Sequence, residues 1–63
     1  MSVAELTAVG MLLISAECRA PKGLARRALV RQFDRVLDAL QRQPSQEARD
    51  AYDRLYRLWC VVG

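Results

Sequence analysis

The 63-residue chain has no histidine, only two cysteines and only three glycines. Without histidine it lacks the commonest general base of enzymes and a frequent metal ligand. The cysteines stand alone, with no Cys-x-x-Cys pair, and no glycine-rich phosphate loop or paired nucleophile and base is present. We therefore expect no enzymatic activity, no metal and no cofactor.

Long hydrophobic runs are also missing. The longest mainly apolar run, residues 8–16, is far shorter than the roughly 20 residues needed to cross a bilayer. No basic segment precedes it and no small-residue cleavage site follows it, as a secretory signal would require. The expectation is a soluble, cytoplasmic protein without a membrane partner.

Positive charge is concentrated in one segment. The chain has nine arginines and one lysine against seven acidic residues, which gives a net charge of +3. Residues 19–42 carry seven basic and two acidic side chains, whereas residues 43–63 balance three against three. A localised field of this kind can steer an acidic partner.

The first predicted helix covers residues 3–17. Ser2 and Glu5 have the spacing of a capping box, in which each side chain bonds the other residue's backbone N–H. The apolar residues that follow spread over most of the circumference, which favours contacts on more than one side. Gly10 costs about 1 kcal/mol against Ala in mid-helix. A close approach by the backbone of another helix would account for it, and chance accounts for it equally well.

Two further helices follow, over residues 24–41 and 46–60. Pro21 and Gly23 favour a chain reversal before the second helix, whose apolar residues fall within an arc of roughly 120°. Pro44 ends it, and Ser45 can cap the third helix. Acid and arginine four residues apart predict two exposed ion pairs on the third helix: Asp50 with Arg54, and Asp53 with Arg57.

These elements predict an all-α protein. Short joints between neighbouring helices favour a small three-helix bundle with up-down-up topology, forming a single domain over residues 1–63. A domain of this size buries only about 60% of its unfolded surface. A second copy is therefore one way of completing the bundle. The alternative is a helical hairpin whose first helix pairs with another copy.

The second helix carries an arginine stripe, for which a solvated, self-paired face is the leading interpretation and a partner-binding surface the alternative. At 100° per residue, four arginines fall within roughly 80° on the side of the second helix opposite its apolar arc: Arg27, Arg31, Arg35 and Arg42. Asp34 and Asp38 lie in or beside the stripe and can pair with its arginines. This interruption favours a mixed-charge or acidic protein surface over bare phosphate.

The first-choice candidate for a partner-binding surface lies at the end of the third helix, with the arginine stripe second. Aromatic residues at helical spacing usually belong to a core, but tyrosine, tryptophan and arginine are also enriched at interface hot spots. The predicted patch consists of Tyr56, Trp59, Val61 and Val62.

Cys18 and Cys60 end the first and third helices, which lie at the same pole of an up-down-up bundle. A disulfide there could stabilise the fold by several kcal/mol, but the cytosol opposes it. We expect two reduced, largely buried thiols, with a native bridge as the alternative.

The function expected from these residues is a small non-enzymatic protein–protein interaction module: an adaptor, regulator or inhibitor that occupies a partner's surface. The chain has more apolar positions than the core of a 63-residue domain can bury, which also predicts self-association. The length, helical content and lack of catalytic groups are similar to those of small regulators made by phages and mobile elements. The alternative is a nucleic-acid-binding accessory protein that uses the arginine stripe.

Overall fold

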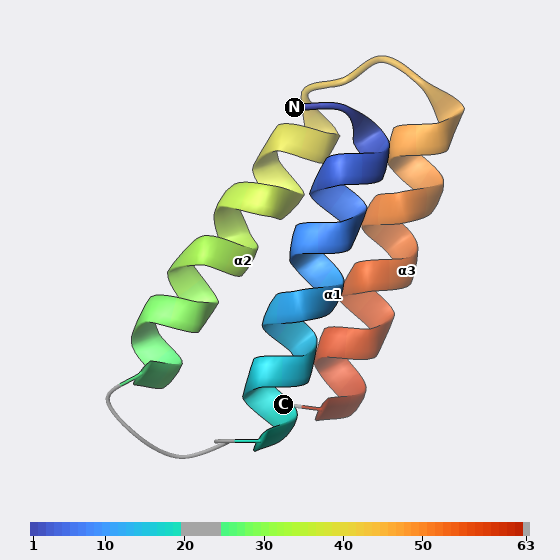
Figure 1. Cartoon of the computed structure of the whole chain (residues 1–63). Helices are drawn as coiled ribbons and strands as arrows, with labels where there is room; N and C mark the ends of the chain where they lie inside the picture. Colours follow the sequence, from blue (N-terminus) through green and yellow to red (C-terminus); the bar gives the residue numbers. More distant parts are fainter. Residues whose placement is uncertain (20–24, 63) are drawn as a thin grey trace.

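A computed structural model describes residues 1–19 and 25–62 of the chain. It contains three α-helices, α1 (Val3–Arg19), α2 (Ala25–Gln41) and α3 (Gln46–Val62), and no strand in these residues (Figure 1). The all-α prediction is therefore confirmed. The first joint, with the turn expected at Pro21 and Gly23 and the helix start expected at Leu24, lies outside the described residues.

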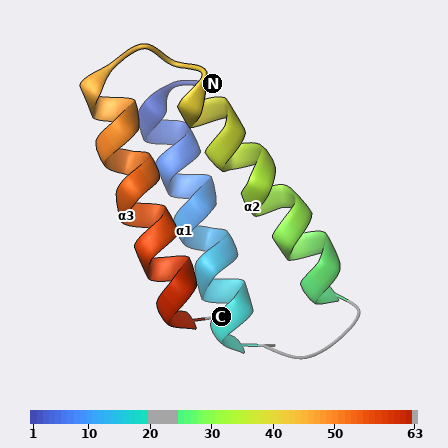
Figure 2. The ribbon, with the colours of Figure 1, turned by 180° about the vertical axis from the view of Figure 1, so that it is seen from behind.

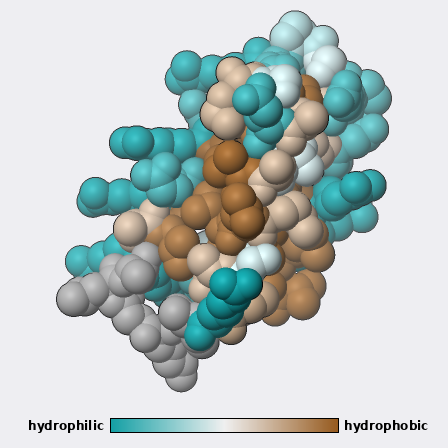
Figure 3. All heavy atoms as spheres, viewed as in Figure 1, coloured by the Kyte–Doolittle hydropathy of each residue, from teal (hydrophilic) through white to brown (hydrophobic). Residues whose placement is uncertain are grey.

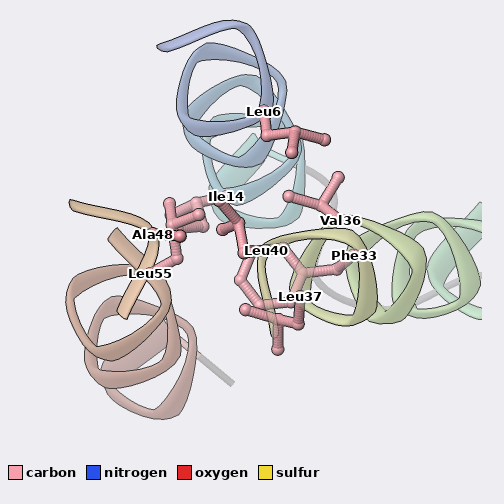
Figure 4. Packing of buried hydrophobic residues seen from close by; sticks show 8 residues of the cluster. All are labelled: Leu6, Ile14, Phe33, Val36, Leu37, Leu40, Ala48 and Leu55. Carbon is pink, nitrogen blue, oxygen red and sulfur yellow. The ribbon is translucent and has the colours of Figure 1, made fainter. Parts of the chain in front are cut away.

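The helices form an up-down-up bundle in which every pair is in contact. In Figure 1, and from behind in Figure 2, α1 is drawn in front of or behind the line between α2 and α3, and Figure 4 shows the three helices at the corners of a triangle. α1 and α3 run in the same direction and α2 runs against them. The ribbons of α1 and α2 diverge toward the beginning of α2 in both views. The molecule is 35 Å long and 19 Å by 14 Å across.

Both predicted helix caps are present. The Ser2 N–H donates to Glu5 Oε1 over 3.1 Å, and the Glu5 N–H donates to Ser2 Oγ over 3.2 Å. The pKa of Glu5 is lowered from its ordinary value of 4.5. The main cause is the hydrogen bond with the Ser2 backbone, and the second is hydrogen bonding with the Ser2 side chain. The Ala48 N–H donates to Ser45 Oγ over 3.1 Å at the start of α3. These bonds satisfy backbone donors that a helix terminus would otherwise leave unpaired.

The predicted helices 3–17 and 46–60 each end two residues too early. No helix breaker follows Glu17 before Pro21, so α1 continues to Arg19. At the other end of the chain, α3 continues to Val62, which packs against the core. The apolar end of the sequence is thus the last turn of a helix.

The core is built by side chains from all three helices, which converge between them in Figure 4. α2 contributes half of it, because its apolar residues recur every three or four positions on one side. The buried apolar residues are Leu6, Ile14, Phe33, Val36, Leu37, Leu40, Ala48 and Leu55. The amphipathic arc predicted for α2 is confirmed.

Gly10 of α1 packs against Leu55 of α3. A Cβ atom built on Gly10 would lie 2.7 Å from Cδ1 of Leu55 and 2.9 Å from its Cδ2. Leu55 is fully buried and fills the space that any larger residue would need. The approaching group is therefore a side chain, which corrects the suggestion of a helix backbone at this glycine.

Candidate partner-binding surfaces

The four arginines of the stripe are exposed on the side of α2 that faces away from the core. Arg42 pairs with Asp38, with 3.1 Å between Nε and Oδ2. In residues 1–19 and 25–62, Arg27, Arg31 and Arg35 make no ion pair, and Asp34 pairs with none of them. The predicted self-pairing of the stripe therefore occurs only at its Arg42 end. Three of its four guanidinium groups remain available.

These three arginines recur every four residues, so successive ones are about 6 Å apart along the helix axis. At the beginning of α2, the surface is hollowed by a shallow depression of about 430 Å³. Its lining consists of Arg26, Arg27, Val30 and Arg31. Of these arginines, Arg26 pairs with Glu17, so Arg27 and Arg31 are the charges that the hollow offers to an acidic side chain.

The ion pairs predicted on α3 are wrong within the described part of the chain. Neither Asp50 with Arg54 nor Asp53 with Arg57 comes within ion-pair distance. Asp50 instead accepts a hydrogen bond of 2.9 Å from Nε2 of Gln46. Exposed pairs of this kind gain little from contact, because water screens both charges.

The aromatic patch predicted on α3 is divided by the structure. Trp59 is half-buried and stacks on Phe33, with 4.4 Å between ring centroids. Tyr56 is 51% exposed and stacks on Tyr52 at 6.2 Å. Val61 is 85% exposed, but five residues of helix place it about 140° around α3 from Tyr56. Val62 packs against the core cluster, so the four residues do not form one surface.

Cys18 and Cys60 are both free and exposed, which corrects the expectation of buried thiols and leaves the alternative disulfide unformed. Both residues do lie at the ends of their helices, as predicted. However, Cys60 follows the buried Leu55 by five residues and therefore points away from the bundle. The two cysteines therefore lie at the same end of the bundle without their thiols facing each other.

The largest feature that sequence reasoning did not locate is an exposed apolar face on α1. In Figure 3 it forms a hydrophobic area along the middle of the molecule, with hydrophilic side chains to either side. Leu12 is 70% exposed and Met11 is 42% exposed within it. Where this face meets α3 there is a groove of about 480 Å³, lined by Val3, Ala4, Thr7, Ala8, Glu47, Asp50, Ala51 and Arg54.

Glu17 is a second feature that the sequence did not single out. Its side chain is only 1% exposed, and its Oε1 lies 3.5 Å from Nε of Arg26. Neither carboxylate oxygen accepts a hydrogen bond within the described structure. Glu17 lies on the same side of α1 as Leu6, Gly10 and Ile14, but the sequence of α1 does not show that this side is the buried one. This ion pair joins α1 and α2 where their ribbons diverge.

No three cysteine, aspartate or glutamate side chains gather as a metal site would require in residues 1–19 and 25–62. None of the helices in these ranges is both long and apolar enough to cross a membrane. The chain matches no family model, no curated protein and no solved structure. The surface itself is therefore the only guide to function.

Proposed function

We propose that this chain is a small non-enzymatic protein-interaction module, an adaptor, regulator or inhibitor that acts by occupying a partner's surface. The observation that carries the proposal is the row of Arg27, Arg31 and Arg35, which is exposed and makes no ion pair among the described residues. Core packing does not account for this row, because it lies opposite the buried side of α2. The partner offers acidic or mixed charge at a spacing of about 6 Å, as one face of a helix does.

A protein partner fits the stripe better than a nucleic acid. Asp34 and Asp38 lie on the same exposed side as the arginines and would repel a phosphate backbone. A mixed-charge protein surface can offer basic groups to these aspartates. Stacking of bases would need aromatic rings among the arginines, and α2 has only the buried Phe33. The proposal includes a cytoplasmic location, which two exposed and unpaired thiols support.

The test uses the whole chain as bait in an extract of its native host. A variant carrying Arg27→Gln, Arg31→Gln and Arg35→Gln removes the three unpaired charges. The matched control carries Arg49→Gln, Arg54→Gln and Arg57→Gln on the exposed side of α3, with the same change in net charge. We expect a protein that the wild-type chain and the α3 variant capture and that the α2 variant loses.

Nuclease treatment separates the two partner classes. A captured protein that survives nuclease digestion supports the proposal. Capture that is lost to nuclease, with affinity for an oligonucleotide that falls steeply with salt, would favour the nucleic-acid alternative. Equal capture by both triple variants would show that the stripe is not the binding surface.

A further inference from the structure

The outward side of α1 carries a regular row of exposed residues. They recur at alternating spacings of three and four, which keeps them on one face of a helix. The row consists of Glu5, Ala8, Leu12, Ser15 and Arg19, all of them exposed. Its middle is uncharged and includes Leu12, which is 70% exposed and offers an apolar side chain to a partner. No other helix of the bundle covers this row.

The charges at the two ends of this row make it complementary to itself. Glu5 and Arg19 lie seven residues on either side of Leu12, which is about two helical turns in each direction. If a second copy packs antiparallel with Leu12 opposite Leu12, each Glu5 lies opposite an Arg19. A parallel copy would instead place like charges opposite each other at both ends.

The residues between the charges allow two helices to approach closely. Ala8 and Ser15, on either side of Leu12, have short side chains that let the helix axes come near the lower end of the usual 8–10 Å. Glu5 uses Oε1 for its helix cap and has its second oxygen for a partner. Arg19 makes no ion pair within the described residues. Antiparallel α1 helices also align their dipoles favourably.

We infer that the outer row of α1 is the interface of an antiparallel homodimer, with Leu12 at its centre and a Glu5–Arg19 pair at each end. The arginine stripe of α2 lies outside this interface on each copy. The inference therefore goes beyond the proposed function and stands independently of it. One helix from each copy forms a smaller interface than the standard of roughly 800 Å² per partner, so we expect a weak dimer in equilibrium with the monomer.

Sedimentation of the purified chain over a range from micromolar to about 0.5 mM tests the dimer. We expect the mass to rise with concentration toward twice that of the monomer. Leu12→Lys places two like charges at the centre of the interface and is expected to raise the dissociation constant at least tenfold. Tyr56→Lys is the matched control, because it also removes an exposed apolar group but lies on α3. Circular dichroism checks that both variants keep their helices.

Disulfide trapping tests the antiparallel arrangement. In a background with Cys18→Ser and Cys60→Ser, Ala8→Cys and Ser15→Cys each introduce one thiol into the row. In the antiparallel dimer, position 8 of one copy is within about 2 Å of position 15 of the other along the axis, but about 12 Å from its own counterpart. We expect a mixture of the two variants to cross-link and each variant alone to remain reduced.

Each result supports or overturns the inference. A monomer at every concentration, or a Leu12→Lys variant that dimerises like the wild type, would overturn the interface. Cross-linking of each cysteine variant with itself would show a parallel pair and overturn the arrangement. Loss of the arginine stripe leaves the expected dimer intact, so failure of the proposed function is measured separately.

Discussion

α1 and α2 have the same length, and each contacts both other helices, yet α2 separates apolar from charged residues more completely than α1 does. α2 buries its apolar residues and exposes its charges, as the side chains of Phe33 and Arg31 illustrate. α1 exposes Leu12 and buries Glu17. Packing within the bundle accounts for the buried side of α2 and leaves its arginine stripe unexplained. On α1, by contrast, no other helix of the bundle packs on the exposed apolar face. That difference is the reason for inferring that a second copy packs on the outer face of α1.

The largest expected effect contrasts the two helices directly. Phe33→Ala removes a ring that is 1% exposed and stacked on Trp59, and should cost about 3–5 kcal/mol of stability. Leu12→Ala should change the stability by less than about 0.5 kcal/mol, because that side chain is already in water. Urea unfolding at low protein concentration measures both. Equal losses would mean that the outer face of α1 is covered within a single chain.

The inner face of α1 gives the next largest effect. Gly10→Val would force atoms into the space of the Leu55 side chain, at a cost of about 2 kcal/mol. Ala28→Val, on the exposed side of α2, is the control and should lose no more than about 0.7 kcal/mol of helix propensity. Thermal unfolding compares the two variants. A Gly10→Val variant as stable as its control would contradict the close approach.

The buried carboxylate should give a smaller effect of the opposite sign. Glu17→Met removes a desolvated charge that accepts no hydrogen bond in the described structure, and should raise the stability by about 1 kcal/mol. Arg26→Met should lower it, because the carboxylate would lose an ion-pair partner while staying buried. Urea unfolding of both variants checks the signs. Destabilisation by Glu17→Met would show that the ion pair contributes more than its desolvation costs.

The smallest expected effect concerns pH at the start of α1. Because the pKa of Glu5 is lower in the folded chain than its ordinary 4.5, the unfolded chain binds more protons between the two values. The stabilisation is therefore present above pH 4.5 and is lost as the pH falls through the lowered value. Glu5→Gln keeps the hydrogen-bonding pattern of a capping box without the titration. Melting temperatures of both proteins should converge in acid, and a constant difference would argue against this assignment.

How much of the fold could be predicted depended on how clearly each helix separates its faces. The apolar arc of α2 has one direction, so its buried residues, such as Val36 and Leu40, followed from spacing alone. α1 is apolar almost all round, and nothing in its sequence indicates which side faces the bundle. Packing against Leu55 decides this, by placing Gly10 inward and Leu12 outward.

The candidate surfaces were predicted unevenly for similar reasons. The exposure of the arginine stripe followed from its angle on α2, but its ion pairs depended on side-chain conformations that water leaves nearly equal in energy. The position of Cys60 was predicted from the topology of the bundle without its angle around α3. That angle was readable from the five-residue spacing to Leu55 and would have argued against a disulfide.

The stacking of Trp59 on Phe33 allows the contact between α2 and α3 to be followed by tryptophan fluorescence. The chain has a single tryptophan, so all of its indole fluorescence originates between α2 and α3. A change at that contact alters the indole's surroundings directly, whereas a rearrangement on the outer face of α1 leaves them nearly unchanged. Fluorescence on its own therefore follows α2–α3 packing in every variant, including those designed to separate two copies at α1.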